Sequence, residues 1–160
     1  MHRFISVVAG IGLLLATNGV ALAGPPAAAS GTFAVSAITH FALRPAGAAT
    51  FIEQRTEGVV WGTLSGTFED ELQAVVTPSG LVIAQGTMTC ACAIDGKSGM
   101  LTLVQVSRGP LEAQTFEGKA IITGGSGAVS GYRGVLDLHG TVDPNGLATI
   151  QYSGQVHDQP

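Results

Sequence analysis

The stretch GGSGAVSGYRG, residues 124–134, decides the fold, because five of its eleven residues are glycine. Glycine adopts positive φ values at no steric cost, so glycine-rich runs connect β-strands through tight turns. On both sides of the stretch the sequence is rich in β-branched and other apolar residues, as strands are. The stretch therefore predicts a turn between two strands near the C-terminal end of the chain.

Outward from this turn, eight strand-like runs alternate with short segments rich in Gly, Pro, Asn and Asp. These runs cover residues 32–43, 50–57, 61–76 (with a bend at Gly62 or Gly66), 81–92, 100–107, 111–123, 132–142 and 147–157. Loops this short predict antiparallel neighbours, because parallel strands need long crossover connections. A meander of eight strands tends to close, since closure removes the edges. We therefore predict an all-β fold, a single eight-stranded antiparallel up-and-down β-barrel, with a β-sandwich as the competing architecture.

The first residues have the three parts of a secretory signal peptide. A basic start at Arg3 is followed by an apolar stretch from Phe4 to Ala16 and by the A-x-A cleavage site Ala21-Leu22-Ala23. The apolar stretch is shorter than the roughly 20 residues of a membrane-spanning helix. We predict a cleaved signal peptide over 1–23, a flexible lead-in over 24–30 and the barrel over 31–160. The expected location is secreted or periplasmic, in a bacterial cell.

The charge balance limits the classes of partner. Only 11% of the residues are charged and the net charge is −4, which becomes more negative once Arg3 is removed. An acidic chain argues against nucleic acid or an anionic membrane surface as a partner. No segment after the leader is apolar enough to span a bilayer. The fourth and fifth runs are apolar on both faces, which predicts cover by a neighbouring subunit and hence a homo-oligomer.

Four segments resemble a known family. The residues from Gly125 to Gly134 resemble the G-x-G-x-Φ-x-G-Φ-x-G signature of the bacterial family of unknown function DUF3224, where Φ is a large apolar residue. Its opening strand resembles residues 30–33 (SGTF), its central strand residues 64–68 (LSGTF), and its G-x-S-G turn residues 96–103 (GKSGMLTL). The fold-motif glycines are Gly125, Gly127, Gly131 and Gly134.

The family is similar to the allene oxide cyclase and dirigent barrels. The resemblance therefore implies an eight-stranded calycin-like barrel, often oligomeric in the wider group, and it implies no known activity. One departure lies in the fifth strand, where the family often has a Gln-His pair and this chain has Gln105-Val106. Any role of that histidine does not transfer to this chain.

Cys90 and Cys92 form the most unusual pair. In a regular strand they would point to the same face about 6.6 Å apart, whereas a disulfide needs Cβ atoms within about 4.5 Å. A local disulfide therefore requires a distortion, which the strand end before Asp95-Gly96 can supply. The alternatives are free buried thiols, metal binding or an intermolecular bond. No histidine is nearby in sequence, so we predict no metal site and no cofactor.

Charged side chains in two strands are candidates for orienting a ligand. Glu53 and Arg55 share a strand face and could form an internal charge pair, or an exposed pair worth little energy. The run Glu69-Asp70-Glu71 places two carboxylates on one face and one on the other. Glu69 or Glu71 could act as a general acid or base if a barrel mouth raised its pKa; the alternative is a solvated strand end.

Three functions follow from this composition and fold class. The first is a barrel that binds a small apolar or amphipathic molecule, oriented by Glu53, Arg55 or Glu69. The second is a cofactor-free cyclase or isomerase, by analogy with the related cyclases. The third is a filled structural barrel that binds nothing. No catalytic residue is assigned, because the glycine run fits neither a nucleophile elbow nor a phosphate loop.

Overall fold

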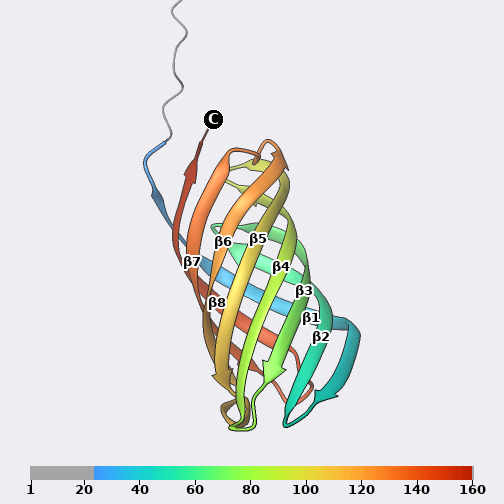
Figure 1. Ribbon diagram of the computed structural model, residues 1–160. Helices are drawn as coiled ribbons and strands as arrows, with labels where there is room; N and C mark the ends of the chain where they lie inside the picture. The colour runs from blue at the N-terminus through green and yellow to red at the C-terminus, as the bar shows by residue number, and fades with distance from the viewer. Residues whose placement is uncertain (1–23, 160) are drawn as a thin grey trace, which may run out of the picture.

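The computed structural model describes residues 24–159 as a single closed β-barrel (Figure 1). The predicted signal peptide, 1–23, lies outside the described residues. The strands are β1 (Ala27–Ala46), β2 (Ala49–Gly62), β3 (Ser65–Val76), β4 (Leu81–Ile94), β5 (Lys97–Pro110), β6 (Thr115–Gly127), β7 (Tyr132–Val142) and β8 (Ala148–Asp158). Each strand pairs antiparallel with the next, and β8 closes the ring on β1. The prediction of eight antiparallel strands in a barrel is confirmed.

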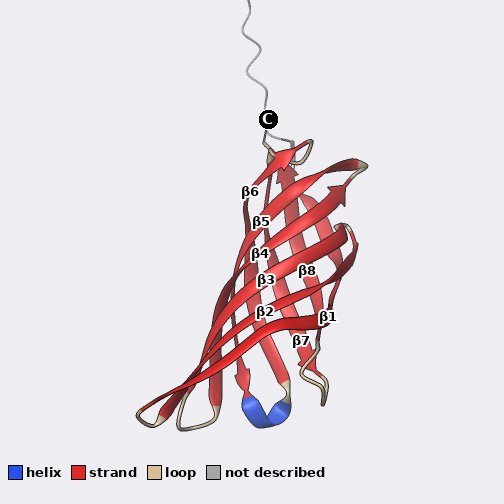
Figure 2. Cartoon of the chain, turned by 90° about the vertical axis from the view of Figure 1, so that its right-hand side faces the viewer, coloured by secondary structure: helices blue, strands red, loops and turns tan. Residues whose placement is uncertain are grey.

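Local turn chemistry sets the two ends of the barrel. At one end lie the β1–β2, β3–β4 and β7–β8 turns, with Gly47, Gly80 and Gly146 at positive φ, and the 3-10 helix Leu111–Ala113 between β5 and β6. This helix marks the lower end in Figure 2, and the C-terminus lies at the opposite end. We call the end with the 3-10 helix the open end and the other the closed end.

The glycine-rich stretch forms the β6–β7 connection at the closed end, as the sequence predicts. Gly127 has φ +69° and ends β6, while Val129 is fully buried and packs into the end of the barrel. At Gly134 the neighbouring strand is close, since a Cβ there would lie 2.5 Å from the carbonyl oxygen of Gln155. Gly125 pairs with Leu101 of β5, and Gly131 accepts a hydrogen bond on its carbonyl from the Gln159 amide.

Three boundaries differ from the sequence prediction. The barrel starts at Ala27 rather than at residue 31, because Ala27–Ala34 pairs with β8 and the small side chain of Ala29 is buried. The predicted run 61–76 is two strands: β2 ends at Gly62, which has φ +118°, and β3 begins at Ser65. The run 111–123 begins with the 3-10 helix, so β6 starts only at Thr115.

Two bulges in β1 change which of its side chains face inward. The register shifts between Val35 and Ala37 and again between Ile38 and His40. The extra residue of each bulge forms a hydrogen bond to β2 with its side-chain hydroxyl. Ser36 donates to the Glu57 carbonyl, and Thr39 donates to the Arg55 carbonyl. Because each extra residue reverses the alternation, Ile38 faces inward between the bulges and Phe41 does so beyond them.

The closed half of the barrel is filled by side chains. Phe33 contacts Phe68 edge to face, with 5.5 Å between ring centroids, and lies 5.0 Å from the ring of Tyr152. The Tyr152 hydroxyl accepts a hydrogen bond from the Leu64 amide at 2.9 Å. Buried aliphatic residues complete this core: Leu101, Leu103, Ile122, Leu136, Leu138 and Val156.

The outer surface carries apolar side chains on β5, β6 and β7. Val104, Ile121 and Val135 occupy directly paired positions on these strands, and each is more than 40% exposed. The homo-oligomer expected from the two-sided apolar strands stays a prediction, which native mass spectrometry tests. Over residues 24–159, no helix has the length and apolar character needed to cross a membrane.

Candidate ligand cavity

The open half of the barrel contains a cavity of about 400 Å³. It lies between the turns of the open end and the filled core. Its walls are mainly apolar and include Val35, Ile52, Leu72, Val82, Phe116 and Ile150. Small inward residues leave the space free, because Ala74 and Ala84 face each other across the β3–β4 pair. The volume is within the range of pockets that hold small molecules.

Polar side chains gather at the floor of the cavity, one layer above Phe68. Asp70 of β3 accepts a hydrogen bond on Oδ2 from Gln105 Nε2 of β5 at 2.7 Å. Thr56 of β2 is directly paired with Asp70. All three floor residues are at most 8% exposed. The barrel thus places one carboxyl group, one amide and one hydroxyl at the inner end of an apolar pocket.

The second carboxyl oxygen of Asp70 is unpartnered. Every other buried side-chain oxygen or nitrogen atom of the described residues has a hydrogen-bond partner, but Asp70 Oδ1 has none. It lies beside Gly86 of β4, where a Cβ would come within 3.2 Å of it. A Cβ at Gly86 would also lie 2.6 Å from the carbonyl oxygen of Glu71, so glycine is needed for the close approach of β3 and β4 at this point. A buried polar atom without a partner costs free energy, so a ligand atom or a water would be stabilised there.

Burial changes the acidity of this carboxyl group. Loss of hydration raises the pKa of Asp70 to about 7, although the Gln105 hydrogen bond acts in the opposite direction; the nearby charge of Glu71 raises it further. Asp70 thus changes protonation near neutral pH. When neutral it can donate a proton or a hydrogen bond, and when ionised it can accept one from a cation.

The three residues expected to orient a ligand lie on the outer face. Glu53 forms an ion pair with Arg44 at 2.6 Å, and Arg55 forms one with Glu71 at 3.0 Å. Glu69 is exposed and alternates with the inward Phe68 and Asp70. The structure therefore brings none of Glu53, Arg55 and Glu69 to the cavity that Asp70 lines.

Cys90 and Cys92 both point inward at the closed end. Both side chains are buried, and their sulfur atoms are within bonding contact, with Cα atoms 5.2 Å apart. We expect the purified protein to contain the local disulfide. An intact mass under non-reducing conditions would then be lighter than the reduced chain by two hydrogen atoms, with no covalent dimer. An unchanged mass after reduction would contradict this expectation.

Asp70 and Gln105 are not among the predicted site residues, although the alternation of side chains in the sequence contains a signal for Asp70. Every second residue of β3 lies on one face, which carries Phe68, Asp70, Leu72 and Ala74. Asp70 is therefore the one carboxylate of the run Glu69-Asp70-Glu71 that shares the apolar face. In the Gln105-Val106 pair, Gln105 is buried and Val106 is 55% exposed. The position at which the family often has histidine is therefore outside the barrel.

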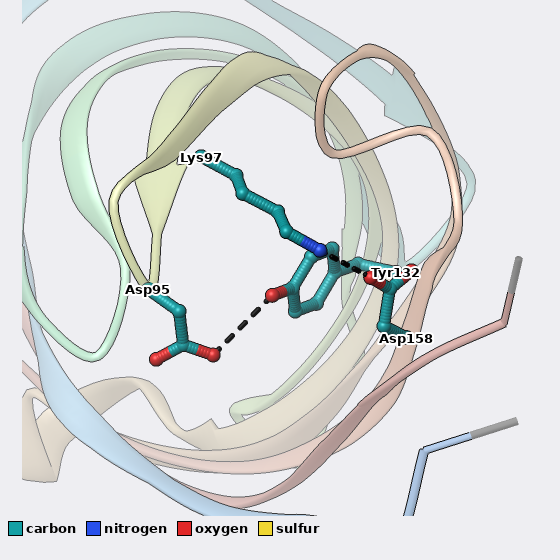
Figure 3. A network of polar contacts seen from close by, with 4 residues as sticks. All are labelled: Asp95, Lys97, Tyr132 and Asp158. Atoms are coloured by element: carbon teal, nitrogen blue, oxygen red, sulfur yellow. Dashed lines mark hydrogen bonds and ion pairs between the residues drawn. The ribbon is translucent and has the colours of Figure 1, made fainter.

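A second polar cluster closes the opposite end of the barrel (Figure 3). The Tyr132 hydroxyl donates to Asp95 Oδ2 at 3.3 Å, and Lys97 pairs with Asp158 at 2.6 Å. Lys97 Nζ also lies 5.6 Å from the centre of the Tyr132 ring. Burial and the nearby Asp95 raise the pKa of Tyr132. The cluster ties the β4–β5 hairpin to β7 and to the end of β8.

Comparisons with known proteins establish the likeness of the fold. No family model and no curated protein match the sequence. The solved structure of a protein of unknown function from the DUF3224 family of Shewanella oneidensis MR-1 aligns with a TM-score of 0.59 and 14% identity, over 81% of this chain and 96% of that chain. The pterocarpan synthase dirigent protein GePTS1 aligns with a TM-score of 0.49 and 15% identity, over 96% of this chain and 100% of that chain. The chain therefore has the fold of the DUF3224 structure, a closed antiparallel β-barrel of eight strands.

Proposed function

We propose that this barrel binds a small amphipathic molecule in the cavity of its open half. The observation that carries the proposal is the unfilled cavity of about 400 Å³, which has apolar walls and a polar floor. A filled structural barrel would have side chains in this space, as the closed half does. Ala74 and Ala84 instead place small residues where larger ones would fill it.

An apolar lip continues the cavity wall beyond the barrel. Leu43 is directly paired with Ile52 and Phe41 with Gln54, and both partners line the cavity. Phe41 and Leu43 therefore lie on the cavity side of the β1–β2 hairpin, yet they are 54% and 56% exposed. Exposed apolar side chains at a pocket entrance support the entry of an apolar or amphipathic ligand rather than a strongly polar one.

Filling the cavity is expected to abolish binding. In Ala84→Phe the new ring occupies the space between β3 and β4, so the affinity for a neutral apolar fluorophore such as phenylnaphthylamine should fall at least about 10-fold. Fluorescence titration of the unsubstituted and substituted proteins measures this change.

The matched control is Gln85→Phe, which adds the same ring at the next residue, on the exposed outer face. It should leave the affinity unchanged. Equal affinities for the unsubstituted protein and Ala84→Phe, with both proteins folded, would place the fluorophore elsewhere and contradict the proposal.

One observation favours a second candidate, the cofactor-free cyclase or isomerase. A group with a pKa near the working pH is an effective general acid or base, and Asp70 has a pKa of about 7 inside an apolar pocket. In an enzyme of this kind the cavity would confine the substrate and Asp70 would transfer the proton. Recovery of a chemically altered ligand after incubation would support catalysis; recovery of the unaltered ligand would support binding alone.

The proposed setting is outside the cytoplasm, after removal of residues 1–23. Native mass spectrometry of the protein from its own secretion pathway tests this setting together with binding. We expect a mature chain that starts at Gly24 and carries an extra mass that denaturation removes. A chain that retains Met1 would contradict export.

A further inference from the structure

The floor of the cavity has a carboxyl group that is incompletely paired. Asp70 Oδ2 is bonded to Gln105, while Oδ1 has no partner among the described residues and lies beside Gly86. A carboxylate oxygen is an acceptor, so the missing partner is a donor. Asp70 and Gln105 both line the cavity, so this carboxyl group forms part of the cavity wall.

No positively charged side chain of the described residues faces Asp70. The elements packed around it present Thr56 from β2, Met88 and Gly86 from β4 and Gln105 from β5, none of which is charged. The neighbouring Glu71 is on the outer face, where it pairs with Arg55.

Two other charged residues line the cavity, both near its mouth. Arg108 forms an exposed ion pair with Glu117 at 3.4 Å. The carboxylate of Asp143 accepts hydrogen bonds from the backbone amides of Asn145 and Leu147 at 2.8 Å each, which lowers the pKa of that carboxyl. Both groups thus have partners of their own, and the ionised form of Asp70 has no cation to balance it.

We propose that the cavity takes an amphipathic amine, with its ammonium group against the Asp70 carboxylate at the cavity floor and its apolar chain directed toward the lip at Phe41 and Leu43. This inference rests on the proposed binding function and names the class of ligand. An ammonium group has three donors. The floor offers Asp70 Oδ1, the hydroxyl of Thr56 and the carbonyl end of Gln105 as acceptors.

The alternative head groups fit less well. An alcohol supplies one donor and leaves the ionised carboxylate without a countercharge. A carboxylate head group adds a second negative charge beside Asp70 in a medium of low dielectric, where like charges repel strongly. An amine instead supplies a charge-assisted hydrogen bond, which is shorter and stronger than a neutral one.

The test compares ligands of equal chain length by isothermal titration calorimetry: decylamine, decanol and decanoate. At pH 8 decylamine should bind at least about 10-fold more tightly than decanol, and decanoate should bind least. Lowering the pH to 5 should weaken decylamine about 100-fold, because the ammonium group must displace the proton of Asp70, whereas the affinity for decanol should hardly change.

Proton release gives a second readout that needs no variant. At pH 6 the free Asp70 is mostly protonated, so binding of decylamine should release about one proton, measured in buffers of different ionisation enthalpy. In Asp70→Asn the preference for decylamine over decanol and the release should both disappear. The matched control is Glu69→Gln, which removes the same charge from the neighbouring outer-face position and should leave both unchanged.

The outcomes separate the two proposals. If decanol binds as tightly as decylamine, or if decylamine releases no proton, the cavity binds ligands but the amine inference is wrong. If none of the three ligands binds and Ala84→Phe also leaves the fluorophore affinity unchanged, both the binding function and the amine inference fail.

Discussion

Asp70→Asn is expected to make the stability of this barrel nearly independent of pH between pH 4 and pH 8. The free energy of unfolding of the unsubstituted protein should fall over this range, and the substitution should remove most of that fall. In the folded protein the pKa of Asp70 is about 7, against 3.8 for an ordinary aspartate. Between these two values the folded state holds a proton that the unfolded state has lost, so the free energy of unfolding falls as the pH rises. The decrease is complete above pH 7 and amounts to at most about 4 kcal/mol.

Urea unfolding of the ligand-free protein at pH 4 and pH 8 measures this effect. We subtract the unfolding free energy of the unsubstituted protein from that of Asp70→Asn at each pH. This difference should be larger at pH 8 than at pH 4 by up to about 4 kcal/mol. Any pH-independent cost of the new amide group at position 70 cancels in this comparison. Glu69→Gln, on the outer face, should show no comparable shift. A pH-independent difference for Asp70→Asn would mean that Asp70 is ionised throughout and fully hydrated.

Phe33→Ala is expected to cost about 3 to 5 kcal/mol of unfolding free energy. Phe33 is 1% exposed and packs between Phe68 and Tyr152 in the closed half of the barrel. Removal of its ring leaves a cavity that the surrounding strands cannot collapse to fill, because the ring of hydrogen-bonded strands fixes the diameter of the barrel.

Phe41→Ala is the matched control, since it removes the same ring from the same strand. Phe41 is 54% exposed on the lip, so its removal should change the stability by less than about 0.5 kcal/mol. Chemical denaturation of both variants gives the comparison. Equal losses at the two positions would contradict the division of the barrel into a filled closed half and an open half.

The sequence predicts the architecture well because turn chemistry is local. Glycine at Gly80, Gly127 and Gly146 adopts positive φ in the structure, and each residue lies in a turn that the composition already indicated. The sequence predicts one bent strand over 61–76, since nothing in its composition distinguishes a glycine bend from the two-residue connection after Gly62. The sequence does not predict the early start of β1 at Ala27, because three alanines carry little strand propensity. Their pairing with β8 depends on closure of the barrel.

The site was harder to predict, because it depends on which face of each strand is inside. The sequence prediction selects ligand-orienting residues by their charge alone. The three selected residues, Glu53, Arg55 and Glu69, all lie on the outer face. The inward face of β3 can be read from the alternation that includes Phe68 and Asp70. The bond from Gln105 to Asp70 joins strands that are not neighbours, so no local pattern predicts it.

The most direct test of the ligand cavity is an NMR titration of the Asp70 carboxyl carbon, without ligand and with saturating decylamine. In the free protein the midpoint should lie near pH 7, as the pKa of about 7 requires. In the complex the ammonium group stabilises the ionised form, so the midpoint should fall below about pH 5. A midpoint that stays near 7 while decylamine is bound would show that the ligand does not reach the floor of the cavity, and would contradict the proposed mode of binding.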